Sequence, residues 1–515
     1  MDRLGQNLFR VPGACNVYVI RNGHRGIAVD LGDGRWVSAL GELGIEALDH
    51  VFLTHHHADQ VGAPAWRSSA ATREAVLHAP AGEERFLDPE AAGKLLEPGA
   101  HLGIGCPASY SVPAGGAPAA RGARFDMAGF TDLFWGTERV RFLHTPGHSP
   151  YACSVLVDVD GRSACFVGDA LHAGGTIWEP YHLEWDHWTG SGVLAAWEGV
   201  QRLRGVEAHL ICPSHGPIVT GASRCAGSLK ALSSRLMDVL EAKGAMYGRR
   251  SDTYVPPVRV LPAYRQYSDR LFQFGTNGYL IRSRAGGALV VDPTVSDLPA
   301  LRSLLADLGA PQIEGSLVTH YHADHCDGAP ALRQEGARVV LHPWVAEPLA
   351  NVKATLAPWL PLEDLHPDEL WPETGDWKWQ DLTFRVAPFP GQTLWHCAFA
   401  ARIDGNLVAF VGDTFQPPSR WNGTGGFCAF NRSLFRQGFD RSARLLLDWR
   451  PHWLAAGHGT VSRFDALRFR AVRRWSRRAE ERIRALCPSG DLERDYYHWG
   501  TGGPRSPYRP EPRLK

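Results

Sequence analysis

Short runs of apolar and β-branched residues alternate along this chain with longer stretches whose apolar positions recur at helical spacing. Val51-Phe52-Leu53 and Ser316-Leu317-Val318 are typical of the ends of buried strands. Helical spacing of the apolar residues predicts four longer helices, over 190–205, 222–247, 440–449 and 462–486. Both halves of the chain therefore combine strands with helices.

The second half of the chain repeats the order of segments in the first. The apolar runs within 8–20 and 271–281 correspond, and Val76-Leu77-His78 matches Val340-Leu341-His342 residue for residue. The offset between the copies is 265 residues at two paired histidine clusters and 244 at two paired Gly-Asp dipeptides. The first copy therefore has about twenty extra residues, which we place in the Gly/Ala/Pro-rich stretch 103–123 as a flexible loop or lid.

A length of 515 residues exceeds what one ordinary core supports, so two domains are expected. We predict a first copy at 1–250, a linker at 251–268, a second copy at 269–487 and a tail at 488–515. The linker is expected because prolines and several arginines interrupt this stretch. The tail is expected because it is polar and proline-rich.

Composition narrows the class of protein. Lys plus Arg and Asp plus Glu both number 54, so no charge excess favours a nucleic acid or an anionic membrane as partner. The N-terminal residues predict no signal peptide, and no apolar run approaches the ~20 residues that span a bilayer. The ten cysteines have no Cys-x-x-Cys spacing, so we expect reduced, mostly buried thiols in a cytoplasmic protein.

The candidate chemistry is concentrated in two histidine clusters, each directly after a predicted strand end. Residues 55–59 read His-His-His-Ala-Asp, and residues 320–325 read His-Tyr-His-Ala-Asp-His. Residues two apart on an extended chain point the same way, so His55 with His57, and His320 with His322, can close on one ion. Imidazole nitrogen and carboxylate oxygen suit Zn²⁺ or another borderline first-row metal. The sequence therefore predicts a duplicated metal-dependent protein.

Further landmarks follow each cluster in the same order. They are Pro146-Gly147-His148, Gly168-Asp169 and Ser214-His215 in copy one, and Pro390-Gly391-Gln392, Gly412-Asp413 and Gly457-His458 in copy two. Together with a His-x-His-x-Asp-His cluster, this ordered set resembles the metallo-β-lactamase superfamily over almost the whole chain. The resemblance implies an α/β fold, an αββα sandwich in each of two tandem copies, with metals at one edge where the strand-end loops meet.

The resemblance also implies a set of ligands for one or two ions per copy, zinc in the first instance with iron as an alternative. In copy one, the first metal would take His55, His57 and His148, the second Asp59 and His215, and Asp169 would bridge them. In copy two, the first metal would take His320 and His322, the second Asp324, His325 and His458, and Asp413 would bridge them.

Each copy lacks one histidine of the family pattern. Gln60 stands at the end of the first cluster, and Gln392 replaces the histidine of the Pro-Gly-His loop. A carboxamide oxygen is a poorer donor for Zn²⁺ than imidazole, so each glutamine is either a weak ligand or a hydrogen-bonding neighbour. His396 is an alternative ligand, although the strand expected there favours another direction. Copy one, with three histidines and an aspartate, is expected to bind metal more reliably.

Several residues outside this set carry weaker expectations. His56 and Tyr321 lie between ligands and should face away from the metals. Surface or hydrogen-bonded roles are expected for the histidines outside the pattern, namely His78, His101, His144, His172 and His342. Walls of a substrate pocket are expected from His182, His187 and Arg420-Trp421-Asn422. Core thiols are expected from Cys153 and Cys397, which correspond between the copies.

Hydrolysis is the reaction that these ligands favour. A bound divalent ion lowers the pKa of water from about 15.7 to roughly 7 and polarises the bond under attack. Asp59 and Asp324 are the predicted catalytic groups, which would orient that water and accept its proton. We expect a small-molecule ester, lactone, thioester, amide or phosphoester as substrate, with no nucleic acid and no membrane as partner. The alternatives are a mononuclear iron oxygenase of sulfur compounds, and one active copy beside a structural pseudo-enzyme.

Overall fold

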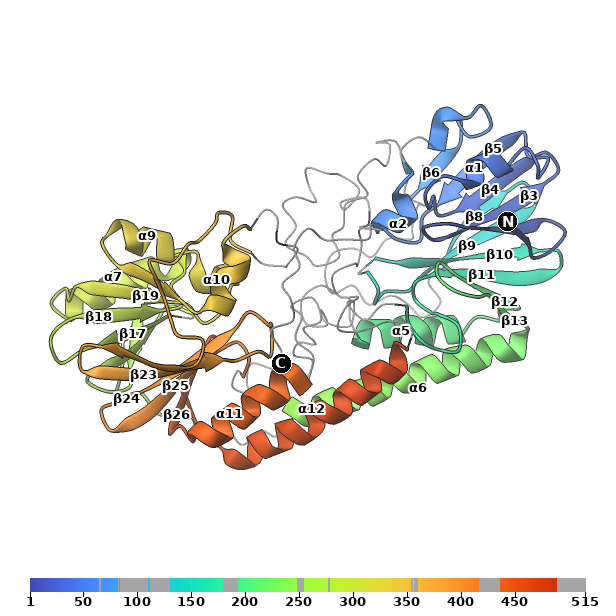
Figure 1. Cartoon of the computed structure of the whole chain (residues 1–515). Coiled ribbons are helices and arrows are strands. Elements are labelled where there is room, and N and C mark those ends of the chain that lie inside the picture. The colour runs from blue at the N-terminus through green and yellow to red at the C-terminus, as the bar shows by residue number, and fades with distance from the viewer. Residues whose placement is uncertain are drawn as a thin grey trace. The chain divides into compact units, whose positions relative to one another are not determined.

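The computed structural model describes residues 1–63, 66–81, 83, 110–111, 130–149, 151–178, 193–247, 254–276, 278–352, 355, 360–415 and 436–488. These residues form two compact units, one from 1–241 and 481–488 and the other from 242–480. Most of the predicted loop 103–123 and the tail beyond residue 488 lie outside the described residues. Each unit contains two β-sheets (Figure 1).

The described part of the first unit has a seven-stranded and a six-stranded sheet. The first sheet contains β1 (Asp2–Arg3), β2 (Leu8–Pro12), β3 (Asn16–Asn22), β4 (Arg25–Val29), β5 (Ala47–Phe52), β6 (Val76–His78) and β7 (Tyr110–Ser111). The second contains β8 (Phe130–Trp135), β9 (Glu138–His144), β10 (Cys153–Val159), β11 (Arg162–Gly168), β12 (Leu210–Pro213) and β13 (Val219–Thr220). The helices are α1 (Trp36–Ala39), α2 (Ala58–Val61), η1 (Trp66–Ser68), α5 (Val193–Arg204) and α6 (Ala222–Tyr247).

The second unit has an eight-stranded and a six-stranded sheet among its described residues. The first contains β14 (Arg259–Val260), β15 (Tyr264–Gln266), β16 (Leu271–Phe274), β17 (Gly278–Arg282), β18 (Ala288–Val291), β19 (Ile313–Leu317), β20 (Arg338–Leu341) and β21 (Glu369–Leu370). The second contains β22 (Gly375–Trp379), β23 (Leu382–Pro388), β24 (Cys397–Ile403), β25 (Asn406–Gly412), β26 (Trp453–Ala456) and β27 (Ser462–Arg463). The helices are η3 (Val295–Asp297), α7 (Leu298–Asp307), α8 (Ala323–Cys326), α9 (Ala329–Gln334), α10 (Pro343–Leu349), the π-helix η5 (Arg436–Asp440), α11 (Arg441–Trp449) and α12 (Ala466–Leu486).

Both units have the same sheet topology. In the first unit, β2, β3 and β4 form an antiparallel meander, and β4, β5 and β6 run parallel. In its second sheet, β11 and β12 are parallel within an otherwise antiparallel array. Strands β16–β20 and β22–β27 repeat this order in the second unit. The carboxyl ends of parallel neighbours meet at one sheet edge, which brings their loops together.

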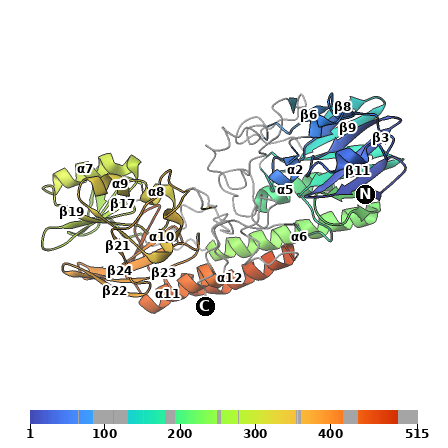
Figure 2. The same ribbon diagram turned by 45° about the horizontal axis from the view of Figure 1, so that its top comes forward.

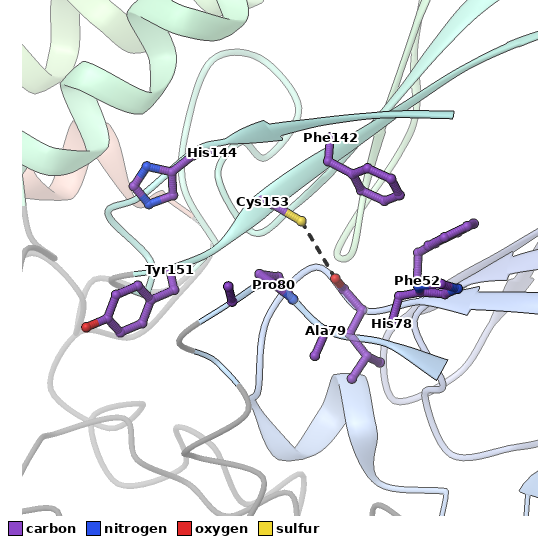
Figure 3. A pocket seen from close by; sticks show the side chains of 10 residues that line it. Phe52, His78, Ala79, Pro80, Phe142, His144, Tyr151 and Cys153 are labelled. Carbon is purple, nitrogen blue, oxygen red and sulfur yellow. Dashed lines mark hydrogen bonds between the residues drawn. The ribbon is translucent and has the colours of Figure 1, made fainter. Parts of the chain in front are cut away.

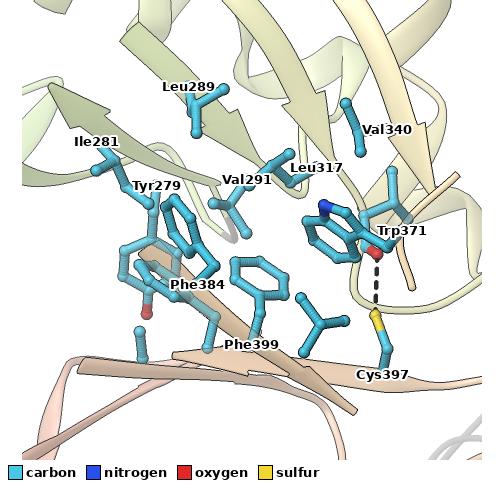
Figure 4. Close-up of a cluster of buried hydrophobic side chains, with 14 of the residues drawn as sticks. Tyr279, Ile281, Leu289, Val291, Leu317, Val340, Trp371, Phe384, Cys397 and Phe399 are labelled. Carbon is cyan, nitrogen blue, oxygen red and sulfur yellow. Dashed lines mark hydrogen bonds between the residues drawn. The ribbon is translucent and has the colours of Figure 1, made fainter. Parts of the chain in front are cut away.

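One core of each unit lies between its two sheets because the inward-facing side chains of both are apolar. In the second unit, Tyr279, Val291 and Leu317 of one sheet face Phe384 and Phe399 of the other (Figure 4). A second cluster joins the outer face of the eight-stranded sheet to α7 and α9 (Figure 2). In the first unit, α5 packs on β9 of the six-stranded sheet. Helices therefore cover the sheets from outside, as expected for an αββα sandwich.

The four predicted helices are confirmed as α5, α6, α11 and α12, with shifts of a few residues at some ends. Two predicted boundaries differ from the structure. The stretch 251–268 contains β14 and β15, and β15 pairs with β16 through Tyr264 opposite Phe274. The prolines of this stretch, at 256, 257 and 262, lie outside both strands and interrupt neither. Residues 481–488, expected to close the second copy, group with the first unit.

Candidate metal centres

The predicted ligands of each copy lie at the strand ends that meet at one edge of the sandwich. In copy one, β5 leads to His55 and His57, β9 to His148, β11 to Asp169 and β12 to His215. The matching strands β19, β25 and β26 lead to the histidines and aspartates of copy two. Residues distant in sequence therefore converge because their strands end at the same edge.

Copy one contains two groups of donor atoms, each within 4.8 Å of one another. They are His55, His57 and His148, and Asp59, Asp169 and His215. His148 Nε2 lies 2.8 Å from His57 Nδ1 and 3.3 Å from Asp169 Oδ2, so Asp169 adjoins both groups. His215 contacts Asp169 through Nδ1 at 2.7 Å and Asp59 through Nε2 at 3.1 Å.

Copy two also contains two groups of this kind. They are His320, His322 and Asp413, and Asp324, His325 and His458. His320 Nε2 and His322 Nδ1 lie 3.1 Å apart. His458 Nε2 is 3.3 Å from both Asp324 Oδ2 and Asp413 Oδ2, so Asp413 again adjoins both groups. The structure thus brings together all twelve residues predicted as ligands, six in each copy.

The charges at each centre favour a cation. Burial opposes ionisation of Asp169, but the imidazoles of His215 and His148 outweigh it and hold its pKa well below the usual range. His458 and His325 likewise outweigh burial at Asp413 and hold its pKa well below the usual range. Each centre therefore pairs a buried carboxylate anion with protonated imidazoles, and a metal ion can replace those protons as the compensating positive charge.

Buried ring nitrogens provide a test of whether the residues fit a metal ion. His55 Nε2, His325 Nε2 and Asp413 Oδ1 are buried atoms that make no hydrogen bond, although the last two lie 3.4 Å apart. Buried polar atoms are normally satisfied, so atoms left in this state at clustered imidazoles and carboxylates fit coordination to a metal. The residues present therefore fit the ion that the sequence predicted.

Two buried aspartates that we did not single out support the first histidine of each cluster. Asp30 accepts hydrogen bonds from the backbone N–H of Thr54 at 2.8 Å and from its hydroxyl at 3.0 Å. The hydroxyl oxygen lies 3.0 Å from His55 Nδ1. Asp292, Thr319 and His320 repeat the arrangement in copy two.

Glu83 is another buried carboxylate outside the predicted set. It accepts hydrogen bonds from the backbone N–H and the ring Nδ1 of His56 and from the Ser149 hydroxyl. Burial opposes its ionisation, but His56 outweighs this and lowers the pKa of Glu83. Through these hydrogen bonds Glu83 connects the loop that contains His55 and His57 with the loop that contains His148. His56 turns its ring to Glu83, as expected for a residue between two ligands.

The two glutamines make similar contacts with Asp169 and Asp413. Gln60 Nε2 donates to Asp59 Oδ2 at 2.9 Å and to Asp169 Oδ2 at 3.4 Å. Gln392 Nε2 donates to Asp413 Oδ2 at 3.0 Å. Both Oε1 atoms are buried without a hydrogen-bond partner. Each amide thus lies at its centre, and whether either oxygen binds metal remains a prediction.

His396 lies directly against the centre of copy two. Its ring stacks on that of His320 with centroids 4.8 Å apart, and both of its ring nitrogens are buried without a hydrogen-bond partner. Burial lowers its pKa to about 3, so the ring is neutral. It belongs to neither donor group of this copy. The ring therefore packs against a predicted ligand instead of pointing away from the centre, and whether it binds metal remains a prediction.

The remaining histidines divide by environment. His342 accepts a hydrogen bond from the Trp344 backbone N–H and contacts Glu373 O, as expected for a satisfied histidine. His172 lies nearer the centre than expected: a Cβ on Gly216 would lie 2.2 Å from its Nε2, beside His215. Trp178 stacks on His215 with centroids 4.8 Å apart, which forms an aromatic wall of this centre. Other expectations fall outside the described residues, namely those for His101, His182, His187 and Arg420-Trp421-Asn422.

A pocket of copy one is lined by none of the predicted ligands (Figure 3). Phe52, Phe142, His144 and Tyr151 are among its lining residues. Cys153 also lines it and donates to Leu53 O at 3.7 Å, and Cys397 makes the matching contact with Val318 O at 3.5 Å. Both cysteines are buried free thiols, as predicted.

Comparison with protein families settles the classification. The family model described as the metallo-β-lactamase superfamily matches the chain twice, over residues 10–215 and 271–458. The chain belongs to the metallo-β-lactamase superfamily. The two matches are the two copies, so the predicted tandem arrangement of this superfamily's fold is confirmed.

Individual relatives within the superfamily are more distant. A curated hydroxyacylglutathione hydrolase from Albidiferax ferrireducens is 38% identical over 130 residues, which cover 25% of this chain and 43% of that protein. A metallo-β-lactamase from Cronobacter sakazakii is 18% identical with a TM-score of 0.36, covering 46% of this chain and 98% of that one. The B3 metallo-β-lactamase BLEG-1 is 21% identical with a TM-score of 0.31, covering 43% and 96%.

Proposed function

We propose that this chain is a metal-dependent hydrolase that binds metal, in the first instance zinc, in both copies. The observation that supports this is the pairing, in each copy, of two groups of imidazole and carboxylate donors within 4.8 Å. In each copy the two groups adjoin a buried aspartate, Asp169 or Asp413. We assign the ligand roles predicted from the sequence to the six residues of copy two and, in copy one, to His55, His57, His148 and Asp169.

A bound divalent ion would supply Lewis acidity, which makes water acidic enough to lose a proton at neutral pH and so become nucleophilic. The side chains of Asp59 and Asp324 are 17% and 48% exposed, whereas those of Asp169 and Asp413 are 4% exposed. Asp59 and Asp324 can therefore accept a proton from the attacking water and pass it to solvent. Asp169 and Asp413 are better placed to hold positive charge.

The substrate is proposed to be a small molecule with an ester, lactone, thioester, amide or phosphoester bond. The name of the Albidiferax relative, a hydroxyacylglutathione hydrolase, puts acyl thioesters first among these. Trp178 stacked on His215 adds an apolar surface next to the donors of copy one. None of the described helices is both long and apolar enough to cross a membrane. The eight described cysteines are free and buried, which supports a reducing, cytoplasmic location.

The test is metal content per chain together with hydrolysis of a panel of acyl thioesters, esters and phosphoesters. His57→Ala should remove metal from copy one and His322→Ala should weaken binding in copy two. If both variants lose activity, both copies catalyse; if one does, the other copy is structural. Iron in the purified protein, with oxygen uptake on thiols, would favour the oxygenase instead. A wild-type chain without metal under metal-replete conditions would refute the proposal.

A further inference from the structure

We propose that Ser214 closes the second metal position of copy one, because it takes the space and the hydrogen bond that an imidazole at position 60 would use. The inference rests on the metal-binding role proposed above. It comes from comparing the copies at two matched pairs of positions. Gln60 and Ser214 in copy one correspond to His325 and Gly457 in copy two.

In copy two, the imidazole and the glycine depend on each other. His325 Nδ1 lies 3.1 Å from Asp292 Oδ2, and this contact directs Nε2 toward Asp324 and Asp413, at 3.5 and 3.4 Å. A Cβ at position 457 would lie 2.6 Å from His325 Cε1 and 2.2 Å from Asp413 Oδ1. Such distances are too short for carbon, so any side chain at 457 would displace the ligand imidazole or the bridging carboxylate.

In copy one, the serine occupies the corresponding place. The Ser214 hydroxyl donates to Asp30 Oδ2 at 3.2 Å, and Asp30 is the counterpart of Asp292. Ser214 is buried, with 2% of its surface exposed. A buried carboxylate requires hydrogen-bond donors. The donor to Asp30 is the hydroxyl of Ser214, whereas the donor to Asp292 is the imidazole of His325.

The contact between the bridging aspartate and the final histidine also differs between the two copies. Asp169 Oδ1 contacts His215 through Nδ1 at 2.7 Å, whereas Asp413 contacts His458 through Nε2 at 3.3 Å. Gln60 turns its amide to Asp59 and Asp169 and makes no contact that replaces the one to Asp30. Restoring a histidine at position 60 is therefore insufficient, because the imidazole would meet the serine side chain.

The experiment measures metal per full-length chain, with circular dichroism and thermal melting to verify folding. Gln60→His alone and Ser214→Gly alone should leave the zinc content at the wild-type value. Gln60→His combined with Ser214→Gly should bind one more zinc ion per chain and melt at a higher temperature in zinc than in chelator. Gain of the ion by Gln60→His alone would overturn the proposal, as would a folded double variant without extra zinc.

The reverse substitutions in copy two test the proposal even if the double variant of copy one does not fold. Gly457→Ser should lose one zinc ion per chain although every ligand remains. Adding His325→Gln should relieve the crowding and raise the melting temperature of the apoprotein without recovering the ion. Unchanged zinc content in Gly457→Ser would overturn the proposal. A wild-type chain without any zinc would instead refute the proposed function, so the two failures are distinguishable.

Discussion

Asp30 and Asp292 are each held in the left-handed backbone region, with φ of 62° and 49°. Each turns the chain at the end of its strand so that the carboxylate accepts hydrogen bonds from a threonine 24 or 27 residues further along, after the neighbouring strand. A hydroxyl has one hydrogen, and in Thr54 and Thr319 it is donated to the aspartate. The hydroxyl oxygen must therefore accept from Nδ1–H of His55 or His320. This fixes the tautomer and leaves the Nε2 lone pair for a metal.

His78 makes the stability of copy one depend on pH. Its Nε2 lies 3.1 Å from His50 Nδ1, and burial together with the charge of His50 lowers the pKa of His78 to about 4. As pH falls from about 6.5 to 4, the unfolded chain takes up a proton that the folded chain resists. Folding is therefore weakened over this window, by at most about 3 kcal/mol at ~1.36 kcal/mol per pKa unit.

The variant His78→Asn removes this titration. Its thermal midpoint should be lower than the wild-type midpoint at pH 7.5 but should fall less between pH 7.5 and 5. His24→Asn, which removes an exposed imidazole, is the control and should follow the wild-type profile. A His78→Asn profile parallel to the wild type would show that the buried pair is not the source.

At the scale of elements, helix α5 positions the loop of His148 by close contact. A Cβ on Gly199 would lie 2.7 Å from Pro146 O, and one on Gly147 would lie 2.4 Å from Ala196 Cα. In copy two a hydrogen bond positions the corresponding loop: the Ser442 hydroxyl in α11 donates to Pro390 O at 2.5 Å. Each helix therefore touches the loop that carries position 148 or 392.

This contact predicts whether replacing the glycine in α5 raises or lowers the stability of the protein. Gly→Ala inside a helix ordinarily stabilises by roughly 0.5–1 kcal/mol. Gly199→Ala should instead lower the melting temperature, and it should weaken zinc binding in copy one because the loop of His148 must move. Gly227→Ala in α6 is the matched control, because a Cβ there meets nothing within 4 Å, and it should stabilise. Equal stabilisation by both would contradict the role of α5.

At this scale, the spacing of apolar residues and the order of the motifs predict most of the structure. The four long helices and the strands before each cluster follow from local spacing, and the ligands follow from the order of motifs. Glu83 could not be found this way, because its contacts to His56 and Ser149 span 27 and 66 residues. The composition of 251–268 predicts a linker, whereas β14 and β15 are strands because of their pairing with the neighbouring sheet strands. His172 was assigned outside the centre because sequence does not show that it packs on Gly216.

At the scale of the whole chain, duplication has produced two centres with different exposure. In copy one the first donor group is buried, with His55 and His148 side chains 1% and 2% exposed, and the second group includes Asp59 at 17% and His215 at 13%. In copy two the second group includes Asp324 at 48% and His458 at 19%. A chelator reaches an ion through its exposed ligands, so the two copies should release metal at different rates.

We therefore expect biphasic loss of zinc to a chromogenic chelator, with the faster phase from the second group of copy two. His458→Ala should abolish the fast phase and retain the slow one, because its imidazole belongs to that group alone. His57→Ala should retain the fast phase and reduce the slow one, because removing one of three buried imidazoles leaves copy one without a closed donor set. The measurement is the amplitude of each phase per chain at constant pH. A single phase unaffected by either variant would mean that exposure does not control release, and that the copies are equivalent despite their different glutamines.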